Sequence, residues 1–392
     1  MSFYPPRRVL MGPGPSDVDP RITGALARPT IGHLDPAFIQ LMDEIKQLLQ
    51  FAFQTSNELT LPISAPGSAG MEACFVNLLE AGDKAIICQN GVFGGRMKEN
   101  VTRAGCEAIM VEDEWGSAVD TAKVAQAIAA HPDAKLLAFV HAETSTGVQS
   151  DAYALCQMAS AAGMLSIVDT VTGLAGIEVD VDGWGADAVY SGTQKCLSCV
   201  PGLSPVTFSQ AAVDVIQSRQ TPVQSWFLDM NLVMGYWGGG AKRAYHHTAP
   251  INALYALHES LTILQEEGLE ASWARHARNH EALKAGLETM GLQLVVEAAS
   301  RLPQLNLVSI PDGVDDAALR TTLLQDYNLE IGAGLGALAG KVWRIGLMGY
   351  ASNPGNVRLC LAALENTLIG QGLSLAGGKA VAAANAVYAS AS

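Results

Sequence analysis

Short hydrophobic runs alternate with longer amphipathic segments from residue 59 onward. The runs are rich in β-branched and aliphatic residues, which is typical of buried strands. In the first amphipathic segment, four apolar residues fall at the i, i+4, i+7 and i+8 spacing of one helix face: Met71, Phe75, Leu78 and Leu79. We expect strands at 59–64, 84–88, 107–111, 135–141, 164–169 and 186–191, and helices at 70–79, 121–130 and 151–162.

This alternation predicts an α/β fold with a mostly parallel sheet covered by helices on both faces. It stops after about residue 250, where long helical stretches lead into a βαβ-like tail with strands at 306–309 and 341–345 and helices at 317–324 and 356–368. We therefore expect an N-terminal arm (1–20), a large domain (21–265) and a smaller C-terminal α+β domain (266–392), whose Ala-rich residues 376–392 form a last helix with a frayed end.

Composition narrows the class of ligand. The chain has 392 residues, 49% of them hydrophobic, so it can bury a large core. Its net charge of −14 argues against nucleic acid or an anionic membrane as the main partner, because both require clustered lysine and arginine. Small molecules are the expected ligands.

The cysteines and the N-terminus predict a cytoplasmic protein. Seven cysteines, an odd number spread along the chain, favour reduced core residues over a disulfide framework. Cys196 and Cys199 have C-x-x-C spacing, but without a second pair we interpret them as structural. The first residues contain no signal-like apolar region, and no apolar stretch is long enough to cross a membrane.

Two polar residues stand at the ends of predicted strands. Asp169 ends the strand at 164–169, and Lys195 follows 26 residues later, just beyond the strand at 186–191. A buried lysine can form an imine with the aldehyde of pyridoxal 5'-phosphate (PLP), and a carboxylate facing the pyridine nitrogen keeps that nitrogen protonated. Strand ends also carry many solvated lysines and aspartates. The pair makes a PLP enzyme a hypothesis that the rest of the chain must support.

Two small-residue segments are candidate anion sites. Gly67 and Ser68 lie between a predicted strand and helix, where free N–H groups can approach a phosphate. Residues 332–337 match the G-x-G-x-x-A pattern of dinucleotide-binding enzymes, and they make a nicotinamide-dependent oxidoreductase the rival from another class. However, a strand-like run follows them, and the next acidic residue is Glu365, too late for a ribose contact. We interpret 332–337 as a loop facing a site.

Arg344 lies inside an apolar predicted strand, where its planar guanidinium could bind a substrate carboxylate or form a structural salt bridge. The segment 245–248 reads Tyr-His-His-Thr. Because adjacent histidines rarely converge on one ion, we expect no metal site there. The hydroxyls of Tyr245 and Thr248 are candidate phosphate donors.

Several segments together resemble the class V, fold-type I PLP aminotransferases, most closely the alanine–glyoxylate and serine–glyoxylate group. They cover nearly the whole chain, at residues 10–16, 53–55, 141–147, 168–169, 191–195, 245–248 and 340–347. The resemblance implies a homodimeric aminotransferase acting on a small amino acid and glyoxylate.

The resemblance also implies residue roles. Lys195 would carry PLP and move the substrate proton, and Asp169 would pair with the pyridinium. Further cofactor contacts would be Gly67, Ser68, Phe93, Thr144, Gln194 and, from the other subunit, Tyr245 and Thr248, whereas Gly14 and Arg344 would contact the substrate. This chain has Phe93 where a tryptophan often stacks and Ser68 where some members have histidine, and each replacement keeps the implied role.

Alanine, ahead of serine, is the predicted amino donor. The alternative within the family is an (S)-ureidoglycine–glyoxylate aminotransferase, which residues 32–38 and 377–381 favour. In that group, glutamine and asparagine stand at the positions of His33 and Trp226, so the amide pair suited to a ureido group is missing here. A catalytically silent small-molecule-binding homologue is the third alternative.

Overall fold

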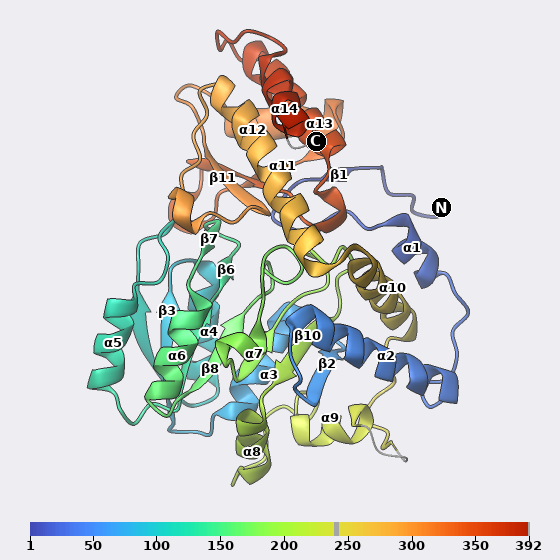
Figure 1. Ribbon diagram of the computed structural model, residues 1–392, viewed down its shortest axis with the longest axis vertical. Helices are drawn as coiled ribbons and strands as arrows, with labels where there is room; N and C mark the ends of the chain where they lie inside the picture. The colour runs from blue at the N-terminus through green and yellow to red at the C-terminus, as the bar shows by residue number, and fades with distance from the viewer. Residues whose placement is uncertain (239–242, 391–392) are drawn as a thin grey trace.

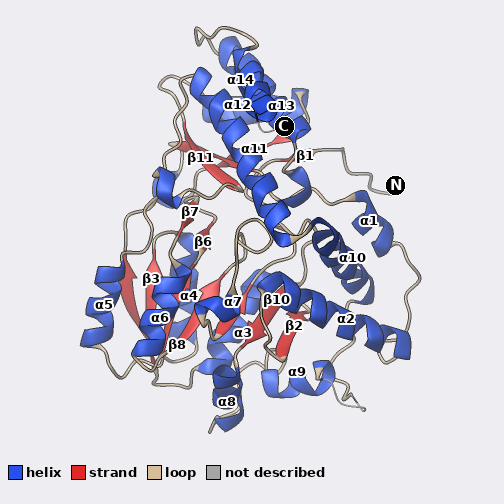
Figure 2. Cartoon of the chain, viewed as in Figure 1, coloured by secondary structure: helices blue, strands red, loops and turns tan. Residues whose placement is uncertain are grey.

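The computed structural model describes residues 1–238 and 243–390. Figure 1 shows a broad lower part built around a large sheet and a narrower upper part formed by the C-terminal elements, with the N-terminal arm beside the upper part. Figure 2 shows that helices surround the strands in both parts.

The large sheet has seven strands in the order β2-β10-β9-β8-β5-β3-β4. Pairing is parallel from β9 through β8, β5 and β3 to β4, whereas β10 runs antiparallel between β9 and β2. The strands are β2 (Leu59–Ile63), β3 (Lys84–Gln89), β4 (Glu107–Glu112), β5 (Leu136–Val140), β8 (Leu165–Asp169), β9 (Ala188–Tyr190) and β10 (Ser204–Phe208). The predicted mostly parallel sheet is confirmed, and β10 is an addition that the sequence pattern did not indicate.

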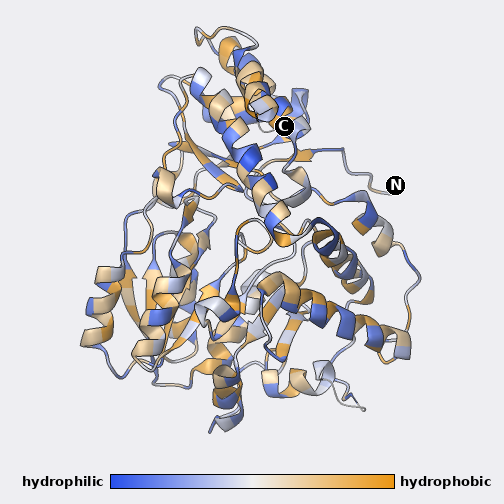
Figure 3. Cartoon of the chain, viewed as in Figure 1, coloured by the Kyte–Doolittle hydropathy of each residue, from blue (hydrophilic) through white to orange (hydrophobic). Residues whose placement is uncertain are grey.

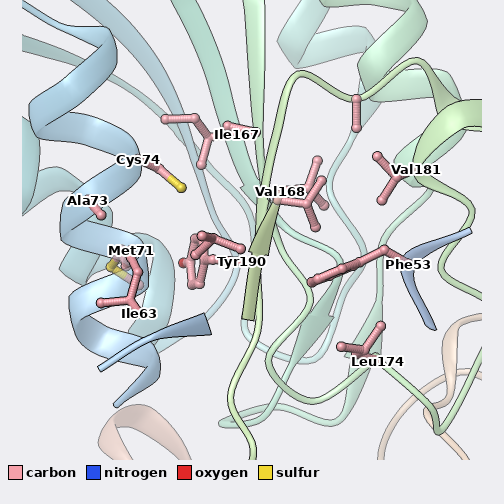
Figure 4. Packing of buried hydrophobic residues seen from close by; sticks show 14 of the residues in the cluster. Phe53, Ile63, Met71, Ala73, Cys74, Ile167, Val168, Leu174, Val181 and Tyr190 are labelled. Atoms are coloured by element: carbon pink, nitrogen blue, oxygen red, sulfur yellow. The ribbon is translucent and has the colours of Figure 1, made fainter. Parts of the chain in front are cut away.

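Helices cover both faces of this sheet, as predicted. On one face lie α3 (Gly67–Leu78), α4 (Val92–Arg103) and α8 (Gln210–Ser218), and on the other lie α5 (Thr121–Ala130), α6 (Ala152–Ala161) and α7 (Val181–Trp184). Figure 4 shows the two layers, with Met71 and Cys74 of α3 beside Tyr190 on one side and Phe53, Leu174 and Val181 on the other. All seven cysteines are buried and free, which agrees with the predicted reduced core residues.

Four helices flank the large sheet near its β2 edge. They are α1 (Pro20–Leu26), α2 (Pro36–Phe53), α9 (Met230–Trp237) and α10 (Ile251–Glu267), and α10 packs against both α1 and α2. Figure 3 shows mostly hydrophobic strands in the large sheet and mixed colours along helices such as α2 and α11 (Leu269–Thr289), consistent with helices that cover a core with one face. No helix in residues 1–238 and 243–390 has the length and apolar character to span a bilayer.

The C-terminal part has its own hydrophobic core, which includes Trp343, Leu361 and Leu364. It consists of α11 (Leu269–Thr289), β11 (Leu305–Ser309), α12 (Asp316–Asp326), β12 (Leu329–Glu330), β13 (Gly332–Ala333), β14 (Val342–Gly346), α13 (Pro354–Gly370) and α14 (Lys379–Ser390). A short strand from the N-terminal arm, β1 (Val9–Leu10), pairs with β12. The predicted domain boundary near residue 265 stays a prediction.

The βαβ-like interpretation of the tail is wrong. Strands β11 and β14 pair antiparallel, because the short strands β12 and β13 intervene after α12 and reverse the direction of the chain. The predicted last helix is present as α14, and residues 391–392 of the predicted frayed end lie outside the described residues.

Candidate active site

Five loops that carry predicted site residues leave the large sheet at the same edge. Strands β2, β3, β5, β8 and β9 all run in one direction, since β2 and β9 are each antiparallel to β10. Their carboxyl ends therefore lie together, which is where α/β sheets bind ligands. The loops bring Gly67, Phe93, Thr144, Asp169 and Lys195 to this edge.

Lys195 is buried against the N-terminal arm. Its side chain is 9% exposed, and its Nζ donates a hydrogen bond to the carbonyl oxygen of Pro13. Gly14 has a φ of +104°, and a Cβ on it would stand 2.5 Å from Lys195 Nζ, so only glycine fits there. Burial lowers the pKa of Lys195 to about 8. The amine is therefore partly neutral near pH 8 and can act as a nucleophile.

Asp169 is a buried carboxylate with two fixed hydrogen bonds. Its Oδ1 accepts from the Val171 backbone N–H at 2.9 Å, and its Oδ2 accepts from the Tyr190 hydroxyl at 2.6 Å. Burial raises the pKa of Asp169 to about 6, although the Tyr190 hydrogen bond and the charge of Lys195 act in the opposite direction. This carboxylate suits a cationic partner in the pocket.

Arg344, in β14, donates only to neutral groups. Its Nε bonds to the carbonyl oxygen of Ala333 at 2.7 Å, and its Nη1 bonds to that of Thr144 at 3.3 Å. The side chain is 7% exposed, and within the described part of the chain it forms no salt bridge. Glu143 acts on the charge of Arg344 without forming an ion pair with it. The guanidinium therefore retains donors for a substrate carboxylate, which favours the ligand-binding interpretation over the structural one.

The glycine-rich segment 332–337 does not form a dinucleotide-binding turn. Its first residues form β13, paired antiparallel with β14, and a short 3-10 turn at Gly336–Leu338 follows instead of an α-helix. The structural context that the nicotinamide alternative requires is therefore missing. As expected of a loop facing a site, the segment contacts Arg344 through Ala333.

Small residues form a cradle at the start of α3. The helix begins at Gly67 after Pro66, and no side chain caps its first N–H groups. A Cβ on Gly67 would stand 3.2 Å from Val171 Cγ2 and 3.3 Å from the Ser191 carbonyl oxygen, so glycine lets these loops meet. Gln194 lies nearby, and its Oε1 is buried and has no hydrogen-bond partner among the described residues. The uncapped backbone N–H groups, the Ser68 hydroxyl and the NH2 group of Gln194 are donors of the kind that a phosphate requires.

Phe93 and Thr144 lie in the loops that follow β3 and β5, which are neighbouring strands of the sheet. Phe93 is the second residue of α4, and the Arg96 guanidinium lies 4.8 Å from its ring centroid. The Thr144 hydroxyl forms a hydrogen bond with the hydroxyl of Thr172 and is buried. An aromatic face and a hydroxyl are thus both present at the carboxyl edge of the sheet.

Tyr245 and Thr248 lie on the surface. Tyr245 is 60% exposed, and its hydroxyl lies 3.3 Å from that of Thr248. The intervening His247 reaches Ser64 through an Nε2–Oγ contact of 2.7 Å, close to the start of α3. The two hydroxyls are thus near the cradle but face outward, and their predicted contribution to a neighbouring subunit stays a prediction.

His33 and Trp226 both contact the segment 245–248. The His33 ring lies 5.0 Å from that of Tyr245, and the indole of Trp226 stacks on His246 with centroids 4.5 Å apart. The two positions considered for donor selectivity therefore belong to one aromatic cluster with Tyr245, His246 and His247.

Two buried site residues escaped the sequence analysis. Tyr190 donates to Asp169, and Glu143 accepts hydrogen bonds from Phe93 and Ser145. Glu143 lies inside a segment used for the resemblance and Tyr190 directly precedes one, but the partners of both are set by which loops share an edge. A polar residue flanked by apolar ones was the available signal, and it does not identify the partner.

The comparisons with known proteins agree with this geometry. The family "Aminotransferase class-V" matches residues 21–362. The alanine–glyoxylate aminotransferase of Nostoc sp. has 45% sequence identity with this chain and a TM-score of 0.92, covering 94% of this chain and 97% of its own. The ureidoglycine–glyoxylate aminotransferase of Bacillus subtilis has 38% identity and a TM-score of 0.97, covering 99% and 100% respectively. The alanine–glyoxylate aminotransferase of Callithrix jacchus is 38% identical over 93% of this chain and 88% of its own.

The chain belongs to the class V aminotransferases. Its fold is that of the fold-type I PLP aminotransferases, as the resemblance implied, with a seven-stranded, mostly parallel sheet and a C-terminal antiparallel sheet. The protein is therefore an aminotransferase, and the PLP-dependent class that was a hypothesis from Lys195 and Asp169 is the class to which its family belongs.

Proposed function

We propose that this protein binds PLP and transfers an amino group from a small amino acid, alanine ahead of serine, to glyoxylate, giving glycine and a 2-oxo acid. The observation that carries the proposal is the convergence of Lys195, Asp169 and Arg344: the charges of Asp169 and Arg344 both act on Lys195. Three groups that a PLP aminotransferase needs thus lie within electrostatic reach of one another.

The residues present fit the cofactor. The uncapped start of α3 with Gly67 and Ser68, helped by Gln194, would hold the phosphate, and Asp169 would face the ring nitrogen. Thr144 would contact ring substituents, and Phe93 would stack on the ring. Tyr245 and Thr248 of a second subunit would complete the phosphate site. When bound, PLP supplies an aldehyde for covalent attachment and a ring that accepts an electron pair.

Lys195 has two tasks in this proposal. Its amine would anchor the cofactor, and once the amine of the substrate has taken its place, the freed Nζ would take the proton from the substrate Cα and deliver it to the carbon contributed by the cofactor aldehyde. A pKa of about 8 suits both directions, because a group that alternates between base and acid works best near the ambient pH. Burial of the side chain also excludes water from the transfer.

Asp169 would set the charge of the cofactor ring, and Arg344 would set the orientation of the substrate. The Asp169 carboxylate, held by Val171 and Tyr190, stabilises a positive charge on the ring nitrogen. Arg344, held by two carbonyl oxygens, presents its remaining donors to the carboxylate shared by alanine, serine and glyoxylate. One fixed arginine thereby serves both the donor and the acceptor.

The first test is the absorption spectrum of the purified protein reconstituted with PLP. We expect a visible band that borohydride abolishes, and no such band in Lys195→Ala, which should still fold and bind PLP noncovalently. A borohydride-reducible adduct retained in Lys195→Ala would refute the assignment. A silent homologue would show the band but no turnover.

Ureidoglycine is the second candidate donor, because the B. subtilis relative that acts on it covers nearly the whole chain. Against it stand His33 and Trp226, two rings in an aromatic cluster where amides would suit a ureido group. A buried polar group of the substrate left without a partner costs about 1–3 kcal/mol, or roughly ten- to a hundredfold in selectivity.

Comparing kcat/KM for alanine, serine and ureidoglycine, with glyoxylate as the acceptor, tests the choice of donor. We expect alanine first, serine second and ureidoglycine last. A preference for ureidoglycine of about tenfold over alanine would replace the alanine assignment, because such a ratio exceeds what a pocket without polar partners can provide.

A further inference from the structure

Glu143 is a buried carboxylate at the proposed site that the mechanism above does not use. It is 0% exposed and ends the short strand β6 (Ala142–Glu143), which pairs with β7 (Val148–Gln149). Three neutral groups donate to it. Its Oε1 accepts from the Ser145 backbone N–H at 2.9 Å and from the Ser145 hydroxyl at 2.6 Å, and its Oε2 accepts from the Phe93 backbone N–H at 3.2 Å.

The first turn of α4 depends on this carboxylate. The N-cap residue of α4 is Gly91, which has no side chain to bond the free N–H groups of the helix. Two residues from the β6–β7 turn take that role instead: the Val92 N–H donates to the Ser145 hydroxyl at 2.9 Å, and the Phe93 N–H donates to Glu143. A negative charge at this end also interacts favourably with the helix dipole.

Glycine at position 91 gives the carboxylate its space. A Cβ on Gly91 would stand 2.5 Å from Glu143 Cγ and 2.5 Å from Ser145 Oγ. The turn and the start of α4 are therefore packed without a gap. Glu143 also adjoins Thr144, whose carbonyl oxygen accepts from Arg344. One three-residue segment, 143–145, thus contacts the start of α4 on one side and Arg344 on the other.

We propose that Glu143 is a positioning residue of the active site, which fixes the first turn of α4 and thereby the plane of the Phe93 ring against the cofactor. This inference rests on the proposed PLP function for the role of Phe93. Burying a carboxylate that forms no ion pair is costly. The Glu143 carboxylate provides two acceptor oxygens at a fixed separation. One bonds to Phe93 in α4 and the other to Ser145 in the β6–β7 turn, so the carboxylate links the helix to the turn.

Glutamine cannot reproduce this arrangement. A carboxylate has two acceptor oxygens, whereas an amide has one acceptor oxygen and one NH2 donor. In Glu143→Gln, an oxygen facing Ser145 leaves the NH2 group against the Phe93 N–H, and the opposite rotamer leaves Ser145 unsatisfied. The substitution conserves the shape of the side chain but removes either its bond to Phe93 or its bonds to Ser145.

Three variants test the proposal. Glu143→Gln breaks the link between α4 and the β6–β7 turn, and Ser145→Ala removes the hydroxyl contacts but keeps the bond between Glu143 and Phe93. Glu99→Gln makes the same chemical change on an exposed face of the same helix, where Glu99 pairs with Arg103. If Glu143→Gln fails to fold, Ser145→Ala still tests the contact between α4 and the β6–β7 turn, because it removes the acceptor of the Val92 amide.

The first readout is amide hydrogen exchange at residues 92, 93 and 145 in the cofactor-free protein, at a pH above about 8, where Glu143 is ionised because burial raises its pKa to about 7. We expect about tenfold faster exchange in Glu143→Gln at Phe93 or at Ser145, depending on which of the two faces the NH2 group, faster exchange chiefly at Val92 in Ser145→Ala, and no change in Glu99→Gln. Because this readout needs no cofactor, it stands even if the proposed function fails. Unchanged exchange at both Phe93 and Ser145 in Glu143→Gln, or at Val92 in Ser145→Ala, overturns the inference.

The second readout is made on the PLP-loaded protein. We expect Glu143→Gln to reduce the visible circular dichroism of bound PLP and to lower kcat about tenfold, while KM for the amino donor changes less than about twofold, since Arg344 is held through a backbone carbonyl. Equal changes in KM and kcat, or a dichroism spectrum like that of Glu99→Gln, would reduce Glu143 to a structural residue and contradict the proposal.

Discussion

Asp169 and Lys195 have pKa values that burial moves toward neutrality from opposite sides. Burial raises the pKa of Asp169 to about 6 and lowers that of Lys195 to about 8. Burial disfavours the charged form of each group. The opposite charge of the partner favours that form and so partly counteracts the shift in pKa. The pair is thus held near the point where small changes in its surroundings alter its protonation, which is useful for a proton-transfer site.

Asp169→Asn should keep the fold and the covalent attachment of PLP but lose about a hundredfold in turnover, or about 2.7 kcal/mol of transition-state stabilisation. The amide oxygen can still accept from Val171 and its NH2 can face the Tyr190 hydroxyl, but a neutral amide no longer favours a protonated ring nitrogen. Steady-state kinetics together with the visible spectrum check this. Near-normal turnover would assign the role to another residue.

The contribution of Asp169 and Glu143 to the stability of the cofactor-free protein should decrease as the pH rises from about 4 to 7. Burial raises the folded-state pKa of Asp169 from 3.8 to about 6 and that of Glu143 from 4.5 to about 7. Their neighbours are Lys195 and Arg96 for Asp169, and Asp169 and Arg344 for Glu143. In this window the folded state binds more protons than the unfolded state, so stability present at low pH is lost as both groups ionise.

Urea unfolding at pH 5 and pH 7.5 measures this loss, and Asp169→Asn is the matched variant. The difference between the two proteins cancels the titration of all other groups. We expect the wild type to lose about 1.4 kcal/mol more than the variant between the two pH values. Equal losses would mean that Asp169 does not carry the shifted pKa.

At the scale of elements, the site depends on how closely α3 approaches the sheet. Gly70 makes that approach possible, because a Cβ there would stand 3.1 Å from Ser204 Cβ and 3.3 Å from Tyr190 Cβ. The same helix begins at Gly67, the proposed phosphate cradle. Packing between helix and sheet therefore sets the position of the cradle relative to Asp169 and Lys195.

Gly70→Ala should move α3 away from β9 and β10. We expect a loss of about 1–3 kcal/mol in the free energy of unfolding from overpacking, together with weaker binding of PLP. Gly24→Ala is the matched control, since Gly24 lies in α1 with open space around a built Cβ, and it should stabilise by about 0.5–1 kcal/mol. Thermal unfolding and PLP titration of both variants distinguish overpacking from a general effect of removing a helical glycine.

The parts of the fold that could be predicted are those with a strong local pattern. Strands β3, β4, β5 and β8 are short apolar runs between amphipathic helices, so periodicity was sufficient to find them. β10 contains Pro205 and two hydroxyl residues, which weaken the strand pattern, and β12 and β13 have two residues each, too few to show one. The antiparallel tail was missed for that reason.

The same contrast holds for the candidate site. Lys195 and Asp169 were predicted because each follows or ends a strand, and the carboxyl ends of parallel strands converge. The bonds between Tyr190 and Asp169 and between Glu143 and Phe93 could not be predicted, since they join loops whose relative positions depend on strand order. Reactive residues at strand ends can therefore be predicted from one sequence, whereas hydrogen bonds between loops cannot.

At the scale of the whole molecule, the exposed aromatic residues indicate a surface that another copy of the chain could cover. Trp226 is 62% exposed and Tyr245 is 60% exposed, and both belong to the aromatic cluster near the start of α3. Large exposed aromatic side chains grouped together are typical of interfaces. This placement suits the proposal that Tyr245 and Thr248 reach the phosphate site of a second subunit.

Hybrid dimers test that proposal directly. Lys195→Ala should be inactive, and the double variant Tyr245→Phe with Thr248→Val should bind PLP weakly and have low activity at limiting PLP. If the hydroxyls act across the interface, a hybrid of the two contains one complete site, with Lys195 from one subunit and the hydroxyls from the other. Random exchange at equal amounts should then restore about one quarter of wild-type activity, because half of the dimers are hybrids with one of two sites intact.

If the hydroxyls act within their own subunit, both sites of every hybrid are defective, and mixing restores nothing. Sedimentation at the assay concentration establishes that dimers are present, so that absent recovery in exchanged dimers refutes the shared site.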